Sequence, residues 1–190
     1  MSGSGFHVHG PHDHAVEHAA HQSDNFSGKI AVITAVLATI GAGFGYMGGL
    51  TQNDAAMFKN NAAIKKTEAS NQWNYYQAKS SKQNLSELAT AFPGVDVSKY
   101  KKEVERYKLE KEDIKKGAEK LEAVSLDWDR KSDAAMHEHH RWALATTAVQ
   151  IAISLAAITL LTRKRWMEYA SYAVAGVGLV LGVTAWLHIG

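Results

Sequence analysis

Apolar residues are concentrated in three stretches of this chain, and none of the three contains Asp, Glu, Lys or Arg. The stretches are Ile30–Leu50, Trp142–Thr162 and Tyr169–Ile189. A helix needs about 20 mainly apolar residues to cross the hydrocarbon core of a bilayer. Because each stretch has that length, the pattern predicts three transmembrane helices, at residues 29–50, 142–162 and 166–189.

The polar segment at residues 51–141 has a different pattern, in which apolar side chains alternate at spacings of three and four residues. Pro93 and Gly94 interrupt it, so we expect a turn near residues 92–96. After the turn, a seven-residue repeat predicts a helix-pairing seam. The seam positions are Val97, Tyr100, Val104, Tyr107, Ile114, Ala118, Leu121 and Trp128.

The arm before the turn has a fainter seven-residue repeat, which consists of Met57, Ile64, Asn71, Ala78 and Leu85. Asn61, Glu68 and Lys82 interrupt the face beside it. This arm alone would pair poorly, but it fits beside the second arm. The sequence therefore predicts an all-α fold, with an antiparallel coiled-coil hairpin at residues 51–141 inserted between the first and second spans.

Glycines recur every four residues in two of the predicted spans, as Gly41, Gly45 and Gly49 and as Gly178 and Gly182. Glycine at this spacing lines one side of a helix and lets another backbone approach closely. We therefore expect both sets to be helix-packing surfaces. The facing helix can belong to the same chain or to another subunit.

A short basic turn, Arg163-Lys164-Arg165, joins the second and third spans. Basic residues in short loops mark the cytoplasmic side, whereas long loops contribute little to orientation. We therefore expect this turn and the N-terminus to be cytoplasmic, and the hairpin to be periplasmic.

Charge and composition exclude several classes of function. The formal net charge is only +2, from 21 basic and 19 acidic residues, and the basic residues are not gathered in one segment, which argues against nucleic-acid binding. The chain has no cysteine, so disulfides and thiolate metal ligands are excluded. No nucleophile–base pair or phosphate-binding loop is recognisable, so we expect neither an enzyme nor a cofactor.

Histidines occur in a polar N-terminal tail, residues 1–28, and again beside the second span. Those with helical or adjacent spacing are His14, His18 and His21 in the tail and His137, His139 and His140 near the span. Neutral imidazole binds zinc, copper and nickel. We expect adventitious transition-metal affinity rather than a defined metal site, and we expect the tail to be flexible.

The stretches TQNDAA (Thr51–Ala56) and WNYYQAKSSKQN (Trp73–Asn84) carry a family resemblance. Together with the His-rich leader and the apolar C-terminal pair, they make the chain similar to a bacterial family of small membrane proteins known as a domain of unknown function. The resemblance implies a multi-pass protein of the bacterial inner membrane. It carries no activity over to this chain.

Three functions are compatible with these features. The leading hypothesis is a structural or scaffolding membrane protein that contacts lipid and self-associates through its glycine-lined spans and its hairpin into a homo-oligomer. The first alternative is a pore-forming or transporter-accessory membrane subunit. The second is a metal- or pH-sensing module that uses the His-rich tail, whose imidazoles titrate near pH 6.5.

Overall fold

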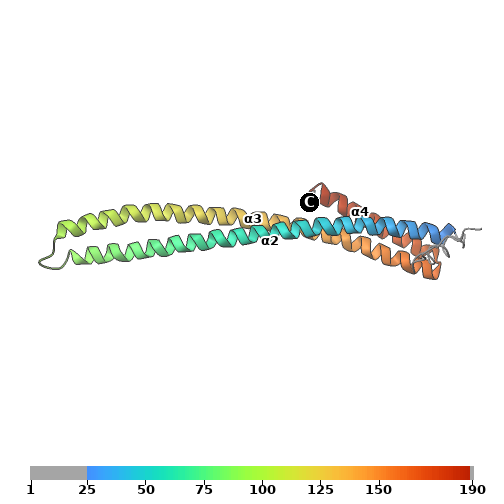
Figure 1. Cartoon of the computed structure of the whole chain (residues 1–190), viewed down its shortest axis with the longest axis horizontal. Helices are drawn as coiled ribbons and strands as arrows, with labels where there is room; N and C mark the ends of the chain where they lie inside the picture. Colours follow the sequence, from blue (N-terminus) through green and yellow to red (C-terminus); the bar gives the residue numbers. More distant parts are fainter. Residues whose placement is uncertain (1–24, 189–190) are drawn as a thin grey trace, which may run out of the picture. The chain divides into compact units, whose positions relative to one another are not determined.

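The computed structural model describes residues 25–188, and nearly all of them are helical. The helices are α2 (Asn25–Ala89), α3 (Val97–Thr162) and α4 (Arg165–Trp186), and no strand occurs between residues 25 and 188 (Figure 1). The prediction of an all-helical chain with long helices is confirmed for this range. The histidines predicted for the tail lie outside the described residues.

The helices contribute to two compact units. The arm unit is Gly49–His139, and the span unit comprises the described residues on either side of it, 25–48 and 140–188. Both α2 and α3 contribute residues to each unit, whereas α4 lies wholly in the span unit. We describe each unit by itself.

In the arm unit, α2 and α3 run antiparallel and are joined by serine hydrogen bonds. The Ser132 hydroxyl donates to the Ala55 carbonyl at 2.8 Å, and the Ser125 hydroxyl donates to the Ala62 carbonyl at 2.9 Å. Because the residue number rises on α2 as it falls on α3, the two helices point in opposite directions. A serine can reach a backbone carbonyl of the facing helix only if small residues let the helices approach closely.

The turn between these helices spans residues 90–96. Gly94 has a φ of +83°, in the left-handed region that favours glycine. The Asp96 carboxylate accepts a hydrogen bond from the Lys99 amide at 3.1 Å, which caps the first turn of α3. The predicted turn near residues 92–96 falls within this segment.

The face of α2 that contacts α3 differs from the predicted one. Ala55, Ala62 and Ala69 are buried there, whereas Met57 and Ile64 are exposed. The prediction placed the larger hydrophobic residues in the seam. The serine hydrogen bonds require the two helices to lie close together, however, and only small side chains fit between them. The first-arm seam is therefore shifted by two residues from the prediction.

On α3, the predicted seam residues follow the buried face. Val104 and Ala118 are buried, Val97 is exposed near the turn, and the rest are half-buried. The half-buried set is Tyr100, Tyr107, Ile114, Leu121 and Trp128. Trp128 stacks on Phe58 of α2, with ring centroids 5.6 Å apart.

The span unit contains the three apolar segments, and each of the three helices is long and apolar enough to cross a membrane. Leu37 of α2, Val149 and Ala152 of α3, and Ala175 of α4 form its buried cluster. Only residues 163 and 164 separate α3 from α4. Arg163 has a φ of 52° and its amide donates to the Thr159 carbonyl at 2.8 Å, which ends α3 in a left-handed residue.

Candidate helix-packing site

The buried face of α4 consists mostly of small residues, and Gly178 lies at its closest contact with α3. The face comprises Glu168, Ser171, Ala175, Gly178, Gly182 and Ala185. A Cβ atom added to Gly178 would lie 2.9 Å from Val149 Cγ2, 3.1 Å from the Val149 nitrogen and 3.2 Å from Ala148 Cβ. Beside it, the Ser171 hydroxyl donates to the Ala152 carbonyl at 2.8 Å. Gly178 is therefore a packing glycine within this chain.

Two further predicted glycines also contact neighbouring helices of the same chain. The Phe44 ring of α2 occupies the space that a side chain at Gly182 would fill. A Cβ atom on Gly41 would lie 3.2 Å from Val149 Cγ1. Val149 is therefore packed between glycines of α2 and α4.

Gly45 and Gly49 differ from the other three predicted glycines. Both are exposed, and a Cβ atom at either position would have no neighbour within 4 Å among the described residues 25–188. The structure thus divides the five predicted packing glycines: Gly41, Gly178 and Gly182 pack within the chain, and the remaining two face away from it.

A polar contact that the sequence did not indicate joins the start of α2 to the start of α4. The Lys29 ammonium donates to the Glu168 carboxylate at 3.0 Å, and the Tyr172 hydroxyl donates to the same carboxylate at 2.8 Å. Glu168 is buried, whereas the Lys29 side chain is largely exposed. The pair is 139 residues apart in sequence, so no local spacing could indicate it.

A second polar contact that the sequence did not indicate joins α3 to the far end of α4. The Arg141 guanidinium donates to the Thr184 carbonyl at 2.6 Å. The adjacent Trp142 is buried and packs on Phe44, with ring centroids 5.5 Å apart. Trp142 lies two heptads after Trp128, so extending the α3 repeat would have indicated its burial.

In the arm unit, charged and aromatic side chains of α2 and α3 contact one another in the part of the seam that follows the buried alanines of α2. The Lys79 ammonium lies 2.5 Å from the Glu110 carboxylate and 5.1 Å from the Tyr75 ring centroid. Lys111 lies 5.0 Å from the Tyr76 ring centroid. The hydrogen bond from Lys79 lowers the pKa of Glu110 and raises the pKa of Lys79. This cluster joins the two arms electrostatically.

No group of three metal-binding side chains comes together among residues 25–188. His137 and His140 are exposed, and His139 is half-buried. The other three candidate histidines, His14, His18 and His21, precede the described residues. The adventitious metal affinity expected from the sequence stays a prediction.

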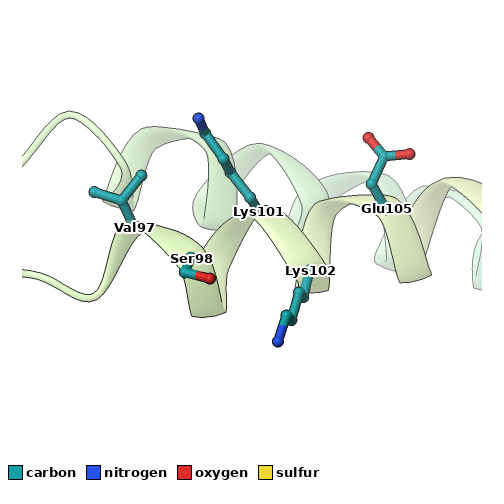
Figure 2. A pocket seen from close by; sticks show the side chains of 5 residues that line it. All are labelled: Val97, Ser98, Lys101, Lys102 and Glu105. Atoms are coloured by element: carbon teal, nitrogen blue, oxygen red, sulfur yellow. The ribbon is translucent and has the colours of Figure 1, made fainter.

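A surface hollow lies at the beginning of α3, lined by Val97, Ser98, Lys101, Lys102 and Glu105. Figure 2 shows Lys101 and Glu105 projecting to one side of the helix and Lys102 to the other. Ligand sites usually present a few polar groups that converge on an apolar pocket. Because Lys102 projects away from Lys101 and Glu105, the polar groups do not converge on one pocket, and this hollow gives no argument for a small-molecule site.

The family comparison matches residues 26–188 to a family described as Domain of unknown function (DUF4337). The match covers most of the chain, so the chain belongs to this family, and the resemblance to a domain of unknown function is confirmed. No curated protein and no solved structure matches the chain.

Proposed function

We propose that this DUF4337 protein is a multi-pass scaffold of the bacterial inner membrane, which self-associates and holds an antiparallel coiled-coil hairpin outside the bilayer. Three helices of sufficient length and apolarity support the membrane location. The hairpin is the arm unit, inserted between the first and second spans.

The orientation follows from the turn between the second and third spans. Arg163 and Lys164 form a very short connection and Arg165 begins α4, and basic residues at such a connection favour the cytoplasmic side. The N-terminus then shares the cytoplasm with this turn, and the hairpin and the C-terminus are periplasmic.

The proposal of self-association rests on Gly45 and Gly49, two open glycines of α2. A Cβ atom at Gly41, Gly178 or Gly182 would meet a side chain of another helix, whereas a Cβ atom at Gly45 or Gly49 would meet no neighbour within 4 Å among residues 25–188. Exposed alanines, including Ala38 and Ala42, extend the open glycines into a small-residue face. In a bilayer, such a face gains little from lipid and allows close packing of another helix. A second copy supplies that helix, and closed symmetric assembly is the usual outcome for like subunits.

The test replaces Gly45 by leucine and measures the mass of the detergent-solubilised particle by light scattering. We expect Gly45→Leu to lower the particle mass while helicity, measured by circular dichroism, stays unchanged. Gly43→Leu is the matched control, because Gly43 is equally open but lies on the opposite side of α2, among large exposed residues such as Val32 and Val36. Equal masses for both variants and the wild type would contradict self-association through this face.

A further inference from the structure

One exposed face of α2 in the arm unit carries no charged side chain. This outer face of α2 consists of the heptad positions of Asn60, Ala63 and Ile64, repeated every seven residues between Leu50 and Leu88. Every residue at these positions is exposed, and none is Asp, Glu, Lys, Arg or His. Asn60 and Ile64 are each two residues from the buried Ala62, which at about 3.6 residues per turn places them on nearly the opposite side of α2, and Ala63 lies about 100° from Ala62.

The charges of α2 lie instead beside the contact with α3. Lys59 lies 2.5 Å from Asp129, and Lys66 lies 3.3 Å from Glu122. The exposed side of α3 is charged in the usual way, with residues such as Lys108 and Lys116. An amphipathic surface helix normally places its charged residues on the face away from its partner. The outer face of α2 therefore lacks the charged residues that such a face normally carries, although many of its residues are polar.

We propose that the outer face of α2 binds the same face of a second copy of this chain, in a parallel, in-register contact. The inference rests on the proposed function, because copies anchored with one orientation in one membrane have parallel α2 helices. A charge-free face suits a second copy, since identical surfaces bring no like charges together. Nucleic acid and anionic lipid headgroups require basic residues, which this face does not have.

The parallel direction follows from the shared orientation of the copies in the membrane, and the repeat within the outer face sets the register of the pair. Met57, Ile64, Asn71, Ala78 and Leu85 follow one another at intervals of seven residues, and all are exposed. Residues at intervals of seven lie along one seam of a helix, and one asparagine in such a seam fixes the register of two paired helices. The flanking positions, Asn60, Thr67, Asn74 and Ser81, are polar and uncharged. In register, Asn71 faces Asn71 and each amide can donate to the other. A slip of one heptad sets Asn71 against Ile64 or Ala78, and both amides lose their partners.

The absence of cysteine from the natural chain makes the contact testable by cross-linking of the full-length protein in membranes. Single cysteines are introduced as Ile64→Cys, Asn71→Cys and Ala78→Cys, with Lys66→Cys and Leu109→Cys as exposed controls on other faces. A disulfide requires Cα atoms within about 7 Å. We expect oxidation to give dimers at the three outer-face positions and not at the controls.

The pattern of cross-links also reports the direction of the pairing. A parallel contact links each position to itself. An antiparallel contact centred on Asn71 would link residue 71 to itself but would link residues 64 and 78 only in a mixture of the two variants, and it would overturn the proposal. Equal cross-linking at all exposed positions, controls included, would also overturn it.

A matched pair of leucines gives a second test in the Ala78→Cys background. Leu85 is 65% exposed on the outer face, and Leu109 is 72% exposed on α3. We expect Leu85→Glu to lower the cross-linking yield about tenfold or more, because it sets like charges against each other in the contact. Leu109→Glu should leave the yield unchanged, and both variants should keep wild-type helicity. Equal yields for the two variants would overturn the proposal.

The two proposals fail in different ways. If Gly45→Leu lowers the particle mass but the outer-face cysteines do not cross-link, the contact between outer faces is wrong and self-association through the spans stands. If the cysteines cross-link in the expected pattern and Gly45→Leu has no effect, the glycine contact alone is wrong. A wild-type particle with the mass of one chain and no cross-links would overturn both.

Discussion

Replacing Gly178 with alanine measures how closely α3 and α4 pack. The added Cβ atom would lie 2.9 Å from Val149 Cγ2 and 3.1 Å from the Val149 nitrogen. The second of these neighbours is backbone, so it cannot move aside by a change of rotamer. Either α4 moves away from α3 or the contact stays compressed.

The expected cost follows from two opposing terms. Overpacking of a well-packed site costs about 1–3 kcal/mol. Alanine is favoured over glycine in a helix by about 1 kcal/mol. Gly178→Ala should therefore destabilise the span unit by about 0–2 kcal/mol overall. Gly176 of the same helix isolates the propensity term, because a Cβ atom there would meet no neighbour within 4 Å among residues 25–188.

The measurement is the thermal midpoint of both variants in the same detergent, followed by circular dichroism. Gly176→Ala should be as stable as the wild type or slightly more stable, and Gly178→Ala should melt at a lower temperature than Gly176→Ala. If the two variants melt at the same temperature, the close contact between α4 and Val149 does not exist in the protein.

Three further predictions concern the arm seam and the ion pairs. Leu121→Glu should destabilise the arm unit by about 1–3 kcal/mol, because it places a charge in the half-buried seam, whereas Ala123→Glu at an exposed position should not change the melting temperature. Lys29→Met should lower the thermal midpoint more than Glu168→Gln does. Lys29→Met leaves the buried Glu168 carboxylate without its cation, whereas in Glu168→Gln the exposed Lys29 ammonium can still be hydrated. The reverse order of the two midpoints would contradict the burial of Glu168. Since the hydrogen bond from Lys79 holds its folded pKa below the ordinary value of 4.5, Glu110 should contribute stability above that pH and lose it as the pH falls through the lowered pKa. Glu110→Gln should therefore flatten the melting-temperature profile below pH 4.5.

Hydrophobic periodicity located the buried face of one arm and not of the other, for a physical reason. On α3, the seam combines small residues such as Ala118 with large ones such as Leu121, so the repeat is visible as hydrophobicity. On α2, Ala55, Ala62 and Ala69 also recur every seven residues, but alanine is only weakly hydrophobic. The stronger repeat of Met57 and Ile64 lies on the exposed face. A search for small residues that recur every seven positions on one arm, with serines at the same interval on the other arm, would have indicated the correct seam.

The glycines and the ion pair show what sequence spacing cannot distinguish. Gly41 and Gly45 belong to the same four-residue repeat, yet within the part of the chain that the structure describes a Cβ atom would meet a neighbour, Val149, only at Gly41. Whether a glycine faces a neighbouring helix depends on the positions of the two other helices, and the local sequence does not specify those positions. Lys29 and Glu168 meet only because α2 and α4 pack in one unit.

The two serine hydrogen bonds of the arm unit constrain how the length of the arms can change. Ser125 and Ser132 are seven residues apart on α3, and their acceptors Ala62 and Ala55 are seven residues apart on α2. Adding or removing seven residues from both arms at once preserves this pairing. An insertion of one or two residues between the two bonds in one arm would rotate that helix and turn serine or alanine away from the contact. Between these two bonds, the arms can therefore lengthen together by seven residues, a step of about 10 Å, without loss of the pairing.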